Sequence, residues 1–258
     1  AKKQKHNLVQ RSVSEFTSRN LTEEDLEHII AINGSRIEDI YDLGAGQKWM
    51  LENSMEGSSA FFLQFLFKAV MPLKPSQFRQ KLEEVSIKRD NIRSAYPHKG
   101  LTQAYRVVLQ DRMVELTFED LSDFDEEALD EKLNSLMAAD RRRGFDLERD
   151  VLLRVAVYKT RGEDTYAILI SQPHINTDGL SLMLLIKDLF GDLNSDMKGL
   201  EQEIDSLSYK KYAEYLDSRD KEAEAGYWKE LLKDMPSCTR IPGVIESTLK
   251  PAISSKEF

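Results

Sequence analysis

The chain has little cysteine and little histidine: one cysteine and four histidines among 258 residues. A single thiol forms neither an internal disulfide nor a thiolate metal cluster, so Cys238 excludes a disulfide-stapled fold and a cysteine-based zinc site. The N-terminus also lacks the basic segment followed by an apolar stretch that is typical of an export signal. We therefore expect a cytoplasmic protein.

Long apolar runs and an excess of positive charge are also absent. The longest apolar segment, residues 61–70, is interrupted by Gln64 and Lys68 and is far shorter than the roughly 18 residues of a membrane span. The 45 acidic residues outnumber the 36 basic ones, which argues against a general binder of nucleic-acid backbones. The basic clusters at 1–6 and 141–143 lie beside acidic stretches and are interpreted as solvated faces.

What the sequence does contain is enough apolar material, 41% of its residues, for one large domain or two small ones. Helical spacing of apolar residues and capping signals predict helices over 22–33, 47–54, 76–88, 125–142 and 180–190, and a long helix or helix pair over about 207–233. Dense β-branched and aromatic runs predict strands over 60–71, 104–109, 113–118, 152–159 and 166–171. The pattern indicates a mixed α/β layer fold.

Three expectations about these elements are specific enough to test. The strand at 60–71 is dense in apolar residues, which predicts burial on both faces. The strands at 104–109 and 113–118 are separated by three polar residues, which predicts a hairpin. The first twenty residues are polar and without periodicity, which predicts a tether.

One histidine stands out by its position. His174 follows a buried strand and precedes a strongly apolar helix, with Asp178 and Gly179 at the start of that helix. His6, His28 and His98 fall in the tether, on the first helix and in a polar loop. A short turn at the end of a sheet is where α/β proteins often carry functional side chains, so His174 and Asp178 are candidate site residues.

Other interpretations of the same turn are open. His174 can be a satisfied core histidine beside a helix-capping Asp178. A metal site would need both residues on one helical face and a further His or Cys nearby, and the sequence offers none. A Ser-His-Asp hydrolase would need a nucleophile elbow, whereas Ser181 lies two residues after a glycine inside a helix start, where capping is its expected role.

The residues around His174 resemble a known family. The segment PHINTDGLS, residues 173–181, resembles the HHxxxDGxS signature of condensation domains from non-ribosomal peptide synthetases, members of the chloramphenicol-acetyltransferase-like superfamily. Four further segments resemble the family's other motifs in the family's order: LGAGQKWML at 43–51, KRDNIRSAY at 88–96, FDL at 145–147 with LLR at 152–154, and YKKYAEY at 209–215.

This resemblance implies a fold and a domain organisation. It implies an α/β, chloramphenicol-acetyltransferase-like subdomain, with a mixed sheet and flanking helices. Residues 1–34 would be a linker from an upstream carrier domain with a short helix, and 35–240 the N-terminal subdomain of a condensation domain. Residues 241–258 would start the crossing to a C-terminal subdomain that this sequence lacks, so that the fragment alone would be inactive.

The resemblance also implies an activity and its partners. An upstream carrier would present an acyl or peptidyl thioester on a phosphopantetheine arm, and a downstream carrier an aminoacyl group whose amine attacks it. The product would be an amide. No cofactor is expected to be bound by the chain itself, since the arms belong to the carriers.

Roles for individual residues follow from the same motif. His174 matches the catalytic second His, and Gly179 the position where a backbone N–H faces the developing oxyanion. Asp178 matches a buried structural Asp that pairs with Arg93, and Ser181 supports the same turn. Pro173 stands where the family has its first His, a departure that an inactive domain would explain.

Three further functional interpretations remain. An epimerization domain shares the HHxxxDG region and a similar entry linker. A condensation-like platform that binds carriers without forming bonds would agree with Pro173. An unrelated free-standing α/β protein would require all five motif matches to be coincidental.

Overall fold

The computed structural model describes residues 11–54, 61–191 and 209–235. They fall into two compact units, the first ending before residue 207 and the second holding 209–235. The basic cluster at 1–6, Cys238 and the predicted crossing at 241–258 lie outside the described residues. The predicted site residues, Arg93 and those of 173–181, all lie in the first unit.

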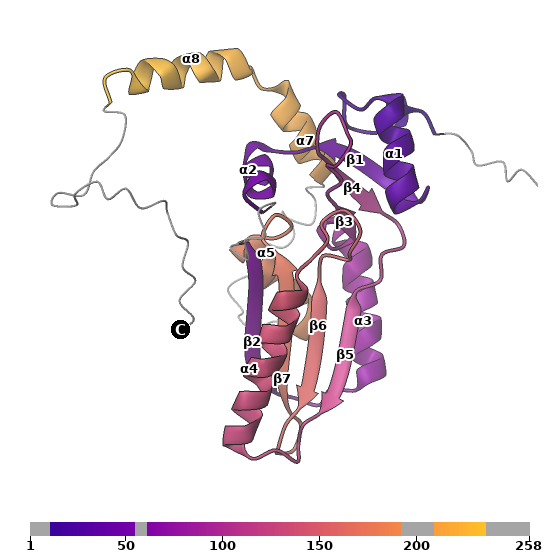
Figure 1. Ribbon diagram of the computed structural model, residues 1–258, viewed down its shortest axis with the longest axis vertical. Coiled ribbons are helices and arrows are strands. Elements are labelled where there is room, and N and C mark those ends of the chain that lie inside the picture. Colours follow the sequence, from indigo (N-terminus) through magenta and orange to yellow (C-terminus); the bar gives the residue numbers. More distant parts are fainter. Residues whose placement is uncertain (1–10, 55–60, 192–208, 236–258) are drawn as a thin grey trace, which may run out of the picture. The chain divides into compact units, whose positions relative to one another are not determined.

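A four-stranded sheet forms the larger part of the first unit (Figure 1). Its strands lie in the order β2 (Phe62–Val70), β7 (Thr165–Pro173), β6 (Arg154–Lys159) and β5 (Glu115–Asp120). β7 is antiparallel to both neighbours, and β5 runs parallel to β6. Both kinds of pairing therefore occur in one sheet, which confirms the predicted mixed α/β class.

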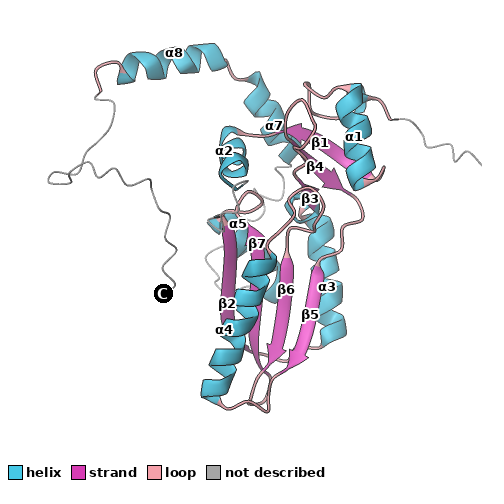
Figure 2. Cartoon of the chain, viewed as in Figure 1, coloured by secondary structure: helices cyan, strands magenta, loops and turns pink. Residues whose placement is uncertain are grey.

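Helices cover both faces of this sheet (Figure 2). On one face α4 (Glu126–Arg143) packs Leu129 and Leu133 against Tyr158 and Leu169 of the sheet. On the other face α3 (Pro75–Lys88) and α5 (Gly179–Phe190) bury the apolar cluster formed by Phe78, Leu82, Val85, Val155, Ile168, Ile170, Leu182 and Leu185. Successive residues of a strand point to opposite faces, so each strand serves both layers.

A smaller sheet in the same unit consists of β1 (Ile37–Asp42), β4 (Tyr105–Leu109) and β3 (Ser94–Ala95). The helix α1 (Glu23–Asn33) packs on it through Leu26 and Ile29, and the Thr22 hydroxyl accepts the Asp25 N–H at the start of this helix. After β1 the chain enters α2 (Ala45–Ser54), and the short 3-10 helix η2 (Asp90–Arg93) leads into β3.

Two expectations about strands are wrong. The strand at Phe62–Val70 exists, but it is the edge of its sheet, and its residues are partly or fully exposed rather than buried on both faces. The strands at Tyr105–Leu109 and Glu115–Asp120 do not form a hairpin, because β4 pairs with β1 and β3 while β5 pairs with β6 in the other sheet. Residues 110–114 instead carry the chain from one sheet to the other.

The expectation of a polar tether is wrong for residues 11–20. The short 3-10 helix η1 (Val13–Glu15) begins there, and Phe16 is buried against the small sheet. The Thr17 hydroxyl donates to Asp39 at 2.7 Å and the Ser18 hydroxyl to Asp42 at 2.6 Å. These polar residues are therefore fixed by carboxylates of β1, contacts that no local pattern predicts.

The second unit contains α7 (Tyr209–Ser218) and α8 (Lys221–Leu232), so of the long helix or helix pair predicted over about 207–233, the pair is observed. Asp220 caps α8 by accepting the N–H groups of Glu222 and Ala223. Among the residues that the structure describes, no helix has the length and apolar character needed to cross a membrane.

Candidate active site

The site is a tight turn between β7 and α5. The His174 N–H donates to the Phe61 carbonyl at 2.7 Å, continuing the ladder between the two strands. The chain then turns, with the Asn176 N–H bonded to the Pro173 carbonyl at 3.1 Å and the Thr177 N–H to the His174 carbonyl at 3.3 Å. The predicted order of strand, turn and helix is confirmed.

Pro173 costs this turn no sheet hydrogen bond. Pro173 lies opposite Phe62 in β2. The next pair, His174 and Phe61, is hydrogen-bonded, and bonded and non-bonded pairs alternate along an antiparallel ladder, so Pro173 and Phe62 form a non-hydrogen-bonded pair. On the other side of β7, β6 begins at Arg154 opposite Ser171, so no strand of the described residues lies beside Pro173 there. Within the described part of the chain, proline at this position therefore removes no ladder hydrogen bond.

The imidazole of His174 is held by one of its ring nitrogens. Nδ1 lies 2.9 Å from the Thr177 carbonyl oxygen. A carbonyl only accepts hydrogen bonds, so this contact assigns the proton of the neutral ring to Nδ1 and leaves a lone pair on Nε2. The side chain is half-buried. The backbone of the turn, through the Thr177 carbonyl, thus sets the orientation of the His174 imidazole.

Asp178 caps the helix that follows. It is exposed, and its carboxylate accepts the Ser181 N–H at 2.8 Å. Hydrogen bonds from the Ser181 backbone and hydroxyl, together with the nearby His174, hold the pKa of the Asp178 carboxyl below its usual range. Of the two residues, Asp178 is the cap and Ser181 its partner, so the expectation that Ser181 caps the helix is wrong.

The predicted ion pair between Asp178 and Arg93 is also wrong. The buried Arg93 guanidinium donates to Glu38 at 2.6 Å, to the Leu109 carbonyl at 2.7 Å and to the Ser86 carbonyl at 2.9 Å. It therefore joins the end of α3 to β1 and β4. The Asp178 carboxylate instead caps the N-terminus of α5, where it accepts the backbone N–H of Ser181.

Tyr96, which ends the segment 88–96, is a site residue that no local sequence pattern indicated. Its buried hydroxyl lies 3.2 Å from both the Ile175 carbonyl and the Asn176 side-chain oxygen, and it accepts from Gln47 at 3.5 Å. Its backbone N–H donates to the Leu147 carbonyl at 2.7 Å. Tyr96 therefore joins residues of four motif segments, those around Gln47, 88–96, 145–147 and 173–181.

Two more side chains of these segments have partly buried polar contacts, of which those of Asn91 reach the turn. Asn91 donates to the Asn176 carbonyl and the Thr177 hydroxyl, both at 3.3 Å. Arg154 donates to Asp140 at 2.7 Å and to the Gly144 carbonyl at 2.8 Å, with its guanidinium 3.8 Å from the centre of the Phe145 ring. The fifth motif segment, 209–215, forms α7 in the second unit.

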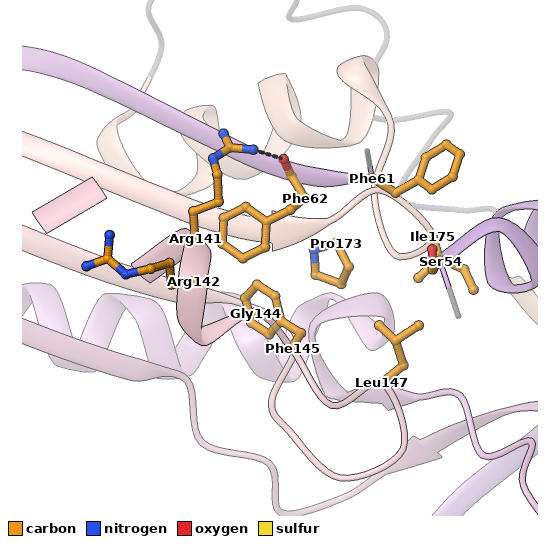
Figure 3. A pocket seen from close by; sticks show the side chains of 10 residues that line it. All are labelled: Ser54, Phe61, Phe62, Arg141, Arg142, Gly144, Phe145, Leu147, Pro173 and Ile175. Atoms are coloured by element: carbon orange, nitrogen blue, oxygen red, sulfur yellow. Dashed lines mark hydrogen bonds between the residues drawn. The ribbon is translucent and has the colours of Figure 1, made fainter. Parts of the chain in front are cut away.

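Space is available at two places beside the turn. A methyl group on Gly179 would meet no atom within 4 Å outside its own turn and chain neighbours. On the α4 face, a pocket of about 260 Å³ opens between Pro173, Phe62 and Phe145 (Figure 3). The arrangement offers a proton acceptor at Nε2 of His174, a helix N-terminus at Gly179 and room for a ligand.

Comparisons with known proteins agree on one family. The family model described as Condensation domain matches residues 37–257. The chain is 26% identical over 236 residues to bacitracin synthase 3 of Bacillus licheniformis, covering 90% of this chain and 4% of that protein. It is 27% identical over 223 residues to gramicidin S synthase 2 of Brevibacillus brevis, covering 84% and 5%.

Solved structures of the same fold are also similar. The starter condensation domain of the rhizomide synthetase matches with a TM-score of 0.60 and 17% identity, over 78% of this chain and 49% of that one. The epimerization domain from the third module of tyrocidine synthetase B matches with a TM-score of 0.57 and 21% identity, over 79% and 47%. The chain thus spans about half the length of these domains and less than a tenth of the curated relatives named above.

Proposed function

This chain belongs to the condensation-domain family, and from that premise we propose that it is the N-terminal half of a domain that forms amide bonds in non-ribosomal peptide synthesis. An acyl or peptidyl thioester on an upstream carrier would react with the amine of an aminoacyl group on a downstream carrier. Residues 1–34 would lead from the upstream carrier as a linker with a short helix, its part from residue 11 packed on the small sheet. Residues 35–240 would be the N-terminal subdomain, and 241–258 the start of the crossing to the second half.

The observation that carries this proposal is the orientation of His174. The Thr177 carbonyl holds Nδ1, so Nε2 is the atom available to a substrate amine. In the reaction a carbon–nitrogen bond forms, the carbon–sulfur bond breaks, and the amine proton passes by way of Nε2 to the departing thiolate. His174 thereby keeps the amine neutral and correctly oriented as it attacks.

Gly179 would act on the other reacting atom. It is the first residue of α5, where backbone N–H groups are not used by the helix and the helix dipole is positive. Negative charge that develops on the thioester oxygen is stabilised at such a place. The open space beside Gly179 and the partial exposure of His174 fit the thioester end of a pantetheine chain, which the carriers would supply.

The experiment that tests the function uses the complete domain between its two carriers, one loaded with an acyl group and the other with an aminoacyl group. We expect amide product on the downstream carrier by mass spectrometry, and none when the downstream carrier is left unloaded. Inversion of the donor α-carbon without amide formation would instead indicate epimerization, the function of one similar solved domain. Binding of both carriers without either product would indicate a platform, the alternative that Pro173 favours.

Replacing Gly179 with alanine separates the role of this position in the reaction from its role in the fold. The added methyl meets nothing and the backbone is not left-handed, so the free energy of unfolding should stay within about 0.5 kcal/mol of wild type. Amide formation should slow by about 10- to 100-fold, because the methyl occupies the approach to the helix N-terminus. Single-turnover rates and urea denaturation measure the two quantities.

Gly226→Ala in α8 is the matched control. Its methyl also meets no atom within 4 Å. It should raise helix stability by about 0.5–1 kcal/mol and leave the rate unchanged. A Gly179→Ala variant as fast as wild type would remove Gly179 from the proposed site.

A further inference from the structure

The orientation of the His174 ring depends on the shape of the turn that follows it. Nδ1 lies 2.9 Å from the carbonyl oxygen of Thr177, three residues further along the chain. The backbone bond between the same two residues, from the Thr177 N–H to the His174 carbonyl, is 3.3 Å long, beyond the roughly 2.7–3.2 Å of an ordinary N–H···O bond. Rotation of the intervening peptide groups would move the Thr177 carbonyl, and this backbone bond resists that rotation only weakly.

The Tyr96 side chain holds the two residues in between. Its hydroxyl lies 3.2 Å from the Ile175 carbonyl oxygen and 3.2 Å from Oδ1 of Asn176. Both atoms accept hydrogen bonds, so the hydroxyl proton is directed at the turn. All three residues are buried, and hydrogen bonds in such a low-dielectric environment are stronger than in water.

The direction of this hydrogen bond is fixed from the other side of Tyr96. Oε1 of Gln47 accepts the Gly44 N–H at 3.2 Å, which assigns the other end of the Gln47 amide, Nε2, as the donor to the Tyr96 oxygen at 3.5 Å. Tyr96 therefore accepts from Gln47 and donates its own proton to the turn. The chain of hydrogen bonds runs from α2 to the residues between His174 and Thr177.

Asn91, in η2 just before Tyr96, holds the next peptide group. Its side-chain amide donates to the Asn176 carbonyl and to the Thr177 hydroxyl, both at 3.3 Å. The Ile175 carbonyl is thus held by Tyr96 and the Asn176 carbonyl by Asn91. Neither peptide group can rotate without breaking a hydrogen bond to the segment 91–96.

We propose that Tyr96 is a positioning residue for His174. Its hydroxyl keeps the Thr177 carbonyl in place, and that carbonyl keeps the proton of the neutral ring on Nδ1 and the lone pair on Nε2. Without the hydroxyl the carbonyl moves, and the ring shifts toward the form that carries its proton on Nε2, which cannot accept a proton there. The effect on catalysis rests on the proposed function, because Nε2 is the atom that meets the substrate amine. The effect on the ring does not.

Tyr96→Phe in the complete domain tests the proposal, because it removes one oxygen atom and keeps the buried ring. Nitrogen NMR of the histidine-labelled domain reports which ring nitrogen carries the proton, and the His174 signal is the one missing from His174→Ala. We expect the Nδ1–H form in wild type and a shift toward the Nε2–H form in Tyr96→Phe. Single-turnover amide formation should slow by about 10- to 100-fold at an unchanged half-saturating concentration of the downstream carrier.

Tyr105→Phe is the matched control. Tyr105 is also buried, and its hydroxyl lies 2.9 Å from the Asn20 carbonyl and 2.8 Å from the Asp25 carboxylate, beside α1 and not at the turn. This variant should lower the urea midpoint and keep both the ring form and the rate. Asn91→Ala, at a partly exposed position, is a second variant and should shift the His174 ring in the same direction as Tyr96→Phe.

Several outcomes would overturn the proposal. A wild-type ring in the Nε2–H form, an unchanged ring form or an unchanged rate in Tyr96→Phe, or equal effects in Tyr105→Phe would each do so. The proposed function can fail separately. A shifted ring form in a domain that makes no amide would contradict the function and support the hold of Tyr96 on the ring, whereas amide formation that does not respond to Tyr96→Phe would do the reverse.

Discussion

His174→Ala in the complete domain is expected to reduce the rate of amide formation by about 10²- to 10⁴-fold, the usual contribution of a general base. Nε2 of this residue is the atom that the turn leaves available, while Nδ1 is committed to the Thr177 carbonyl. Loading of the two carriers is a separate event and should be unchanged. Single-turnover formation of the amide, followed by mass spectrometry, measures the effect.

The structural role of His174 needs its own control. Removing the side chain forfeits one hydrogen bond to a carbonyl, which contributes about 0.5–1.5 kcal/mol. His174→Asn offers an amide N–H in place of Nδ1 and no base in place of Nε2, so it should be nearly as stable as wild type and as slow as the alanine variant. An asparagine variant with a near-normal rate would show that His174 only shapes the turn.

Arg93→Ala is expected to lower the free energy of unfolding by about 3 kcal/mol. The guanidinium is buried and satisfies the Ser86 and Leu109 carbonyls as well as pairing with Glu38. Bonds from a charged donor contribute about 1.5–3 kcal/mol each, and carbonyls left buried without a donor add a further cost. Glu38 is half exposed, so water solvates its charge after the change. Urea denaturation of the chain measures the loss.

A double-mutant cycle distinguishes this arrangement from the pairing with Asp178 that the family motif implied. Asp178→Ala removes a helix cap and should cost about 1 kcal/mol. Because the two side chains share no partner, their effects should add within about 0.5 kcal/mol. A larger coupling energy between positions 93 and 178 would restore the predicted ion pair, whereas coupling between Arg93 and Glu38 is expected.

The positions of most helices and strands were predictable because their signals are local. Thr22 and Asp125 cap the helices that follow them, and Gly144 ends α4 with the positive φ of 63° that glycine tolerates best. The strand, turn and helix around His174 follow from an apolar run, a proline and a capping aspartate, all within residues 165–190. Each of these effects operates within a few residues of chain.

Strand pairing was not predictable in the same way. Strands at 104–109 and 113–118 have the composition and spacing of a hairpin, yet each finds its partners elsewhere. A strand's pattern shows which face is apolar but not which other strand completes its ladder, because the hydrogen-bonding groups are the same in every strand. For the same reason the sequence did not predict that β2 lies at the edge of its sheet.

The sequence by itself therefore determined the family, the order of the elements and the turn that carries His174, because motifs, caps and periodicity are properties of neighbouring residues. The tertiary structure alone decided that Arg93 pairs with Glu38, that Tyr96 joins four motif segments, and that Arg141 and Arg142 border a pocket. These contacts join residues far apart in the chain. A buried polar group takes whichever partner the packed chain brings within about 3 Å, and that choice exists only after folding.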